Sequence, residues 1–268
     1  MGGVRISINL CEPARQELKV SLEWTPRVHH QSWLMPSWTP GSYTVRDHAQ
    51  HLHSLELQQS GRSVSCKRVA PSCWTAELLN LDPVCLTYTL EARQLTVRTN
   101  HLDPDFASLC LPAVVMLIDG ERWNPHHLQL CLPTGWLGHL PLPPVDDGYE
   151  AKDFDHLVDA PVHAGPFHSR PFTVCGHQHE LLTIGTPPMG WPLTFQADIE
   201  AVCEAACTLM GTPPPSGDRY QLVIQLLDQG YGGLEHDHSS VLQFSWEALT
   251  KNDGYRKLLQ LIGHEYFH

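Results

Sequence analysis

The sequence lacks long apolar runs, basic tracts and paired cysteine motifs. No apolar run approaches the ~20 residues that a helix needs to cross a bilayer, so we expect no membrane segment. The opening MGGVRISINL alternates and holds no apolar signal core, which predicts a chain without a secretory signal. The nine cysteines are an odd number and form no C-x-x-C pair. Reduced thiols in a cytoplasmic protein are therefore the simplest expectation.

Positive charge is also scarce. The chain has 17 Lys and Arg against 29 Asp and Glu, a net charge of -12 with neutral histidines. Such a chain binds nucleic acid poorly, because the phosphate backbone needs cationic partners. The 18 histidines reconcile this charge with a pI near 5.8, since they gain protons as the pH falls. With 42% hydrophobic residues, the composition is that of a globular chain with one or two domains.

The first half of the sequence shows no convincing amphipathic helix. Apolar and polar residues alternate instead in VRISINL, ELKVSLEW and LTYTLEA, a period typical of strands with one buried face. Pro40-Gly41 between such segments suits a type II turn. These features predict an antiparallel, sandwich-like all-β domain over residues 1–160.

A stretch rich in Pro, Gly and Asp between Gly135 and Gly165 predicts loops and a domain junction. Beyond it, FTVCGHQHELLTIG, YQLVIQLLD and VLQFSWEAL each read as a strand. FQADIEAVCEAACTLM has helical spacing and is followed by Gly211 as a stop, and a last helix starts near Gly254, capped by Asn252 or Asp253. The predicted fold class is therefore α+β, with residues 161–268 forming a second domain that is cut short.

The last eight residues, LIGHEYFH, contain the H-E-x-x-H pattern of zinc protease helices. At about 100° per residue, His264 and His268 share a helix face that is not the main apolar stripe, and Glu265 lies beside them. Two imidazoles one turn apart suit zinc, and a neighbouring carboxylate can take a proton from an activated water. The pattern predicts His264 and His268 as metal ligands and Glu265 as the general base. In a chain this rich in histidine, the pattern can also arise by chance.

A second segment, YGGLEHDHS from Tyr231 to Ser239, lies between two apolar strands. Gly232 and Gly233 allow a substrate or a backbone to come close. If Glu235 stands on an edge strand, that strand can pair with an extended peptide, and the carboxylate can hold the peptide's free α-amine. The alternative interpretation is a Gly-rich hairpin with exposed acids.

GGLEH followed by HEYFH resembles the glycyl aminopeptidase family of zinc metallopeptidases, within the thermolysin-like gluzincins. SWTPGSYTVRD, residues 37–47, resembles an N-terminal stretch of that family, and DAPVHAG, residues 159–165, resembles its domain-junction motif. The resemblance implies a β domain followed by a thermolysin-like catalytic domain. It also implies a zinc cofactor and the removal of N-terminal residues, preferably Gly, from peptides with a free N-terminus.

Position by position, the resemblance implies that His264 and His268 bind zinc and that Glu265 is the general base. It places Glu235 at the substrate's α-amine. Gly232 and Gly233 then lie on the strand that faces the substrate backbone. For Trp38, Tyr43 and Arg46 the resemblance implies no firm role, and a rigid Pro-Gly turn with a packed aromatic side chain is the expectation.

The family's third zinc ligand is a Glu about twenty residues after the second His, whereas catalytic zinc sites use three protein ligands. We therefore expect this chain to correspond to the front part of such an enzyme and to be inactive alone. Substitution by an upstream histidine is an open alternative, with the candidates His177, His179, His236 and His238. A second alternative is a non-catalytic β-rich binding or docking module that retains a relic metallopeptidase helix. Nothing in the sequence predicts an oligomeric state.

Overall fold

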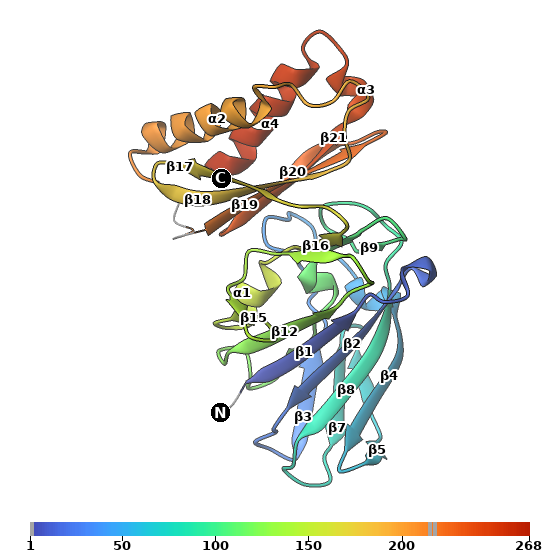
Figure 1. Cartoon of the computed structure of the whole chain (residues 1–268). Coiled ribbons are helices and arrows are strands. Elements are labelled where there is room, and N and C mark those ends of the chain that lie inside the picture. The colour runs from blue at the N-terminus through green and yellow to red at the C-terminus, as the bar shows by residue number, and fades with distance from the viewer. Residues whose placement is uncertain (1–2, 214–215, 217–218) are drawn as a thin grey trace. The chain divides into compact units, whose positions relative to one another are not determined.

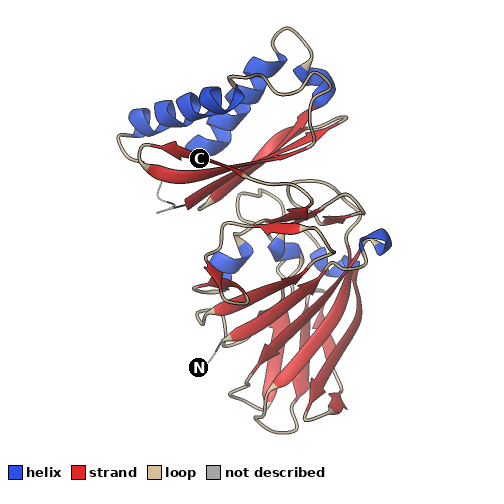
Figure 2. Ribbon diagram, in the orientation of Figure 1, coloured by secondary structure: helices blue, strands red, loops and turns tan. Residues whose placement is uncertain are grey.

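The computed structural model describes residues 3–213, 216 and 219–268. They form two compact units, unit 1 (Met1–Pro166) and unit 2 (Phe167–His268). Figure 1 labels their helices and strands, and Figure 2 shows that strands predominate in unit 1. None of the helices within these described ranges is long and apolar enough to cross a membrane.

Unit 1 is built mainly of strands in three sheets, with one short α-helix, α1 (Phe154–Val158), and three 3-10 turns, η1 (Pro13–Arg15), η2 (His48–His51) and η3 (Leu111–Ala113), in its described part. The largest sheet has the order β14 (Pro144–Val145), β15 (Gly148–Ala151), β12 (His126–Cys131), β1 (Val4–Asn9), β2 (Glu17–Trp24), β8 (Val84–Glu91), β4 (Leu52–Gln59) and β5 (Arg62–Val64). The second has the order β13 (Leu137–His139), β16 (Val162–Gly165), β10 (Ala107–Leu109) and β9 (His101–Leu102). The third has the order β11 (Leu117–Ile118), β3 (His30–Leu34), β7 (Cys73–Glu77) and β6 (Lys67–Ala70).

The predicted period of two explains how the largest sheet packs. In β1, β2 and β8, every second side chain is buried and its neighbours are exposed or half-buried. The buried side chains join Trp33 of β3 and Trp74 of β7 in one hydrophobic core. The prediction of a purely antiparallel domain is wrong in one place, because β1 pairs in parallel with β12. The predicted β-rich N-terminal domain is nevertheless observed.

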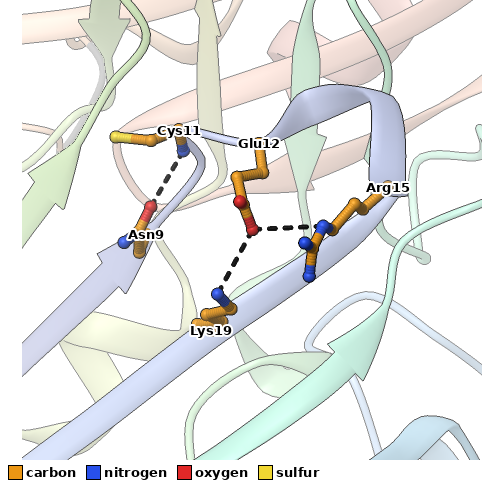
Figure 3. Close-up of polar contacts among 5 residues, drawn as sticks. All are labelled: Asn9, Cys11, Glu12, Arg15 and Lys19. Carbon is orange, nitrogen blue, oxygen red and sulfur yellow. Dashed lines mark hydrogen bonds and ion pairs between the residues drawn. The ribbon is translucent and has the colours of Figure 1, made fainter.

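Exposed polar contacts hold the connection between β1 and β2 (Figure 3). The Nε of Arg15 and the Nζ of Lys19 each lie 3.2 Å from the Oε2 of Glu12. The backbone N–H of Cys11 donates to the Oδ1 of Asn9 over 2.9 Å. Because these side chains are solvent-exposed, each ion pair contributes about 0–1 kcal/mol and mainly defines the local conformation.

The segment around Pro40 is a closed turn, as predicted. The N–H of Ser42 donates to the carbonyl of Thr39 over 3.0 Å, and Gly41 has φ 73°, which a type II turn requires at its third position. The indole of Trp38 donates to the carbonyl of Ser42 over 2.7 Å. The expectation of a packed aromatic side chain is wrong, because Trp38 is 52% exposed and Tyr43 is 98% exposed.

His48 is a buried titratable group behind this turn. It is 4% exposed, and its Nε2 lies 3.4 Å from the Oγ1 of Thr39. Burial, helped by the positive charges of Arg46 and His51 and opposed by Asp47, lowers the pKa of His48 from 6.5 to about 4. The folded chain therefore keeps this imidazole neutral under mildly acidic conditions.

We expect His48 to make the stability of unit 1 sensitive to acid. Between pH 7 and pH 4 the unfolded state binds a proton at this histidine and the folded state does not. The free energy of unfolding therefore decreases as the pH is lowered, and at pH 4 it is about 3 kcal/mol lower than at pH 7. Denaturant unfolding at both pH values should show that His48→Gln removes most of this loss, whereas the control His29→Gln, at an exposed histidine, does not. An unchanged pH dependence in His48→Gln would contradict the assignment.

Unit 2 is a five-stranded sheet with its two longest helices on one face (Figure 1). The strand order is β17 (Arg170–Val174), β18 (His177–Ile184), β19 (Arg219–Leu227), β21 (Ser239–Ser245) and β20 (Tyr231–His236). The three middle strands are parallel, and β17 and β20 pair antiparallel with their neighbours. The helices are α2 (Phe195–Met210), α3 (Trp246–Leu249) and α4 (Gly254–Phe267).

The helix predictions for this unit are largely confirmed. The helix α2 ends at Gly211, which has φ 69°. Asp253 precedes α4, although its side chain makes no cap hydrogen bond. Two strand predictions need correction. FTVCGHQHELLTIG is a hairpin that turns at Cys175-Gly176, and VLQFSWEAL leaves its strand at Ser245, whose hydroxyl caps α3 by accepting from the N–H of Ala248.

Candidate functional site

The last turn of α4 and the C-cap residue that follows it carry the predicted metal ligands on their exposed side. Buried side chains along the helix, including Leu258 and Ile262, pack into the core of unit 2. His264 and His268 are exposed, and their ring centroids are 4.6 Å apart. The two imidazoles therefore share a face, as the spacing predicted.

Glu265 is directed onto β20 rather than into solvent. Its side chain is only 6% exposed. A Cβ placed on Gly233 would lie 2.3 Å from the Cδ of Glu265 and 2.5 Å from its Cγ and Oε1. The carboxylate thus occupies the space that any larger residue at position 233 would fill. The backbone of Gly233 does not have a positive φ. A glycine is therefore needed here for its small size and not for its backbone conformation.

Glu235 lies on the same strand and on the same face of the sheet. Gly233 and Glu235 oppose Leu242 and Ser240 of β21, and the side chain of Leu242 belongs to the core beneath the helices. The Oε1 of Glu235 is 3.9 Å from the Nδ1 of His268, within ion-pair range but too far for a hydrogen bond. In the described part of the chain β20 is the last strand of its sheet, so its outer side pairs with no strand there.

Sequence reasoning missed a buried pair behind α4. The hydroxyl of Tyr266 lies 2.8 Å from the Nε2 of His179, and the Nδ1 of His179 lies 3.0 Å from the carbonyl of His177. The sequence motifs did not single out Tyr266, and they offered His179 only as one candidate for a substitute zinc ligand. A signal was present, because a tyrosine in an apolar stripe needs a partner for its hydroxyl.

The donor set fits zinc in part. Two imidazoles one helical turn apart are suitable ligands, and a carboxylate stands beside them. The described residues, 3–213, 216 and 219–268, contain no group of three His, Cys, Asp or Glu able to hold a metal ion. His179 is not available as a third ligand, because both its ring nitrogens face other partners. All nine cysteines, every one within the described ranges, are free thiols.

Comparison with known families decides the relationship. Residues 5–166 match the peptidase M61 N-terminal domain. The chain belongs to the M61 peptidase family. The family resemblance carried by the sequence motifs is thereby confirmed. A comparison with curated protein sequences found no match.

Solved structures similar to this M61 chain include aminopeptidases and a zinc metallopeptidase. An aminopeptidase N family protein from Idiomarina loihiensis matches 99% of the chain with a TM-score of 0.90 and 26% identity. An M1 zinc metallopeptidase from Deinococcus radiodurans matches 98% of it with a TM-score of 0.57 and 11% identity. Aminopeptidase A from Legionella pneumophila, solved with aspartic acid, matches 99% of it with a TM-score of 0.57 and 14% identity.

The M61 chain spans only part of each of these proteins. It covers 47% of the Idiomarina chain, 63% of the Deinococcus chain and 34% of the Legionella chain. The last two similarities, at such low identity, concern the fold alone.

Proposed function

We propose that this chain is the front part of a zinc aminopeptidase that removes N-terminal residues from peptides. The observation that supports this most is the position of Glu265, whose carboxylate lies against Gly233 of an edge strand and beside two histidines on one helix face. A proton acceptor, two metal-binding groups and a peptide-binding strand edge are then contiguous. Release of glycine from a glycyl amide is the activity to measure.

In this proposal His264 and His268 hold the zinc ion, and a Glu outside these 268 residues supplies the third protein ligand. When bound there, zinc would polarise the scissile carbonyl and make a water molecule acidic. The chain's own contribution is to present two imidazoles one helical turn apart and to keep that turn against β20.

Glu265 moves the proton in the proposed reaction. Its carboxylate accepts a proton from the attacking water and then delivers it to the leaving amine. Burial against Gly233 restricts the side chain to one place, so little conformational entropy is lost when the reactants meet. Because the carboxylate lies directly on β20, a peptide paired with that strand would have its scissile bond near the acceptor.

Glu235 would bind the N-terminus of the peptide and so determine which peptide bond is cleaved. Its side chain is about one-third exposed, lies two residues further along β20 than Gly233, and can accept hydrogen bonds from an ammonium group. A bound α-amine at Glu235 would place only the first peptide bond near Glu265. This arrangement supports an exopeptidase rather than an endopeptidase.

The proposal predicts that Glu235→Gln weakens selectivity for a free amine. In an extended chain that supplies the third ligand, kcat/KM for a glycyl amide should fall roughly tenfold, because a charge-assisted hydrogen bond is lost. The control Glu247→Gln, at an exposed helix carboxylate, should leave kcat/KM unchanged. If Glu235→Gln lowers the rates for free and N-acetylated peptides equally, the carboxylate does not bind the amine.

The remaining parts of the proposal rest on the family resemblance. We assign residues 1–160 to the N-terminal β domain and residues 161–268 to the first part of a thermolysin-like catalytic domain, inactive by itself. We also assign a preference for N-terminal Gly and a cytoplasmic location, where free thiols persist. Comparing glycyl, alanyl and leucyl amides tests the preference, and equal rates would refute it.

A further inference from the structure

The bond between Tyr266 and His179 has a defined direction. A carbonyl only accepts, so the Nδ1 of His179 carries the proton that is shared with the carbonyl of His177. The Nε2 of the neutral ring is then an acceptor, and the Tyr266 hydroxyl donates to it over 2.8 Å. Burial lowers the pKa of His179, which keeps the ring in this neutral form.

This bond lies inside the core of unit 2. His179 is 1% exposed, and its ring centroid lies 5.1 Å from that of Phe172, 5.3 Å from that of Tyr220 and 5.7 Å from that of Tyr266. The Sγ of Cys207, on α2, is 3.7 Å from the Tyr266 hydroxyl. In such surroundings the two polar groups have no water to replace a lost partner, so the bond favours one position of Tyr266 strongly.

Tyr266 belongs to the same helical turn as the three residues of the proposed site. At about 100° per residue, it lies roughly 200° around the helix from both His264 and His268, and about 100° from Glu265. The backbone bond from the N–H of His268 to the carbonyl of His264, 3.3 Å long, ends the helix. A last turn held only by such bonds frays, and its side chains then lose a fixed direction.

We propose that His179 and Tyr266 are positioning residues, whose hydrogen bond fixes the rotation and the order of the last turn of α4. By tying the back of this turn to β18, the bond directs Glu265 towards Gly233 of β20 and holds His264 and His268 on one open face. The consequence for zinc binding rests on the proposed function, whereas the ordering of the helix end does not.

The test compares two tyrosines on α4. Tyr266→Phe removes the hydroxyl at the end of the helix. Tyr255→Phe removes a matched one in the first turn, where the hydroxyl donates to the Oδ2 of Asp198 over 2.6 Å. Amide hydrogen exchange over residues 264–268 of the 268-residue chain should become roughly tenfold faster in Tyr266→Phe, the effect of one buried hydrogen bond, and stay unchanged in Tyr255→Phe.

A double variant separates positioning from stability. Tyr266→Phe alone leaves His179 without its partner and should lower the unfolding midpoint. In Tyr266→Phe with His179→Leu both polar partners are gone, so the midpoint should return towards the wild-type value while exchange over residues 264–268 stays fast. Equal exchange in wild type and Tyr266→Phe would overturn the proposal, as would slow exchange in the double variant.

Zinc competition with a chelator, in a chain extended to include the third ligand, gives the second readout. Tyr266→Phe should weaken zinc affinity roughly tenfold, as loss of the same bond implies, and Tyr255→Phe should not. If the extended wild-type chain binds no zinc, the proposed function fails, and the exchange result alone decides whether the pair orders the helix end.

Discussion

Glu265→Gln, in a chain extended to supply the third zinc ligand, is expected to lower the rate of glycine release from a glycyl amide by about 10²–10⁴-fold, the usual contribution of a general base. The substitution keeps the size of the side chain and its place against Gly233, so the fold should be preserved. An amide cannot accept the water's proton, and this loss acts on kcat rather than on substrate binding.

The matched control for this substitution is Glu247→Gln, which changes an exposed carboxylate of α3. Within the described chain this carboxylate forms an ion pair with Lys251, at 3.7 Å. The activity of this variant should equal that of the unsubstituted chain. Glycine release that stays within a few-fold of wild type in Glu265→Gln would mean that another group moves the proton.

Gly233→Ala is expected to be nearly as damaging, although it adds only one methyl group. The new Cβ would overlap the Cδ, Cγ and Oε1 of Glu265 at 2.3–2.5 Å, so the carboxylate or the end of α4 must move. We expect a loss of about 1–3 kcal/mol in the free energy of unfolding, typical of overpacking. In the extended chain, a displacement of the base by about 1 Å should lower kcat about 100-fold.

Gly232→Ala is the control that tests whether overlap with Glu265 causes this loss of stability. Gly232 has φ 148°, and a Cβ there would meet nothing within 4 Å, so Gly232→Ala strains the backbone without touching Glu265. In a Glu265→Ala background, the stability cost of Gly233→Ala should largely vanish, while that of Gly232→Ala should persist. If both costs persist, overlap with Glu265 is not the reason for a glycine at 233.

Much of the fold could be predicted from the local periodicity of apolar residues. The alternation in VRISINL and ELKVSLEW anticipated β1 and β2, and the stop at Gly211 anticipated the end of α2. These features depend on neighbours within a few residues, which a sequence displays directly. The common face of His264 and His268 follows from the same kind of reasoning.

Features that join distant segments were not predictable in this way. The parallel pairing of β1 with β12 joins residues more than a hundred positions apart, and no local pattern records its register. The hairpin at Cys175-Gly176 was read as one strand, because a cysteine with φ 48° gives no turn signal of its own.

The candidate site shows the same division. The residue types of Glu235, Glu265, His264 and His268 are visible in two short motifs. Two other features depend on how α4 packs on the sheet. Gly233 makes room for Glu265, and His179 accepts a hydrogen bond from Tyr266. His179 and Tyr266 are 87 positions apart, so only the folded chain brings them together.

Zinc content and affinity test the central claim most directly. They should be measured by elemental analysis and chelator competition on the 268-residue chain and on a chain extended to include the expected Glu ligand. We predict one tightly bound zinc per extended chain, lost in His264→Ala and in His268→Ala, and only weak, substoichiometric zinc in the 268-residue chain. An extended chain that folds without zinc, or keeps zinc in both variants, would contradict the account, and the first outcome would favour a non-catalytic binding module.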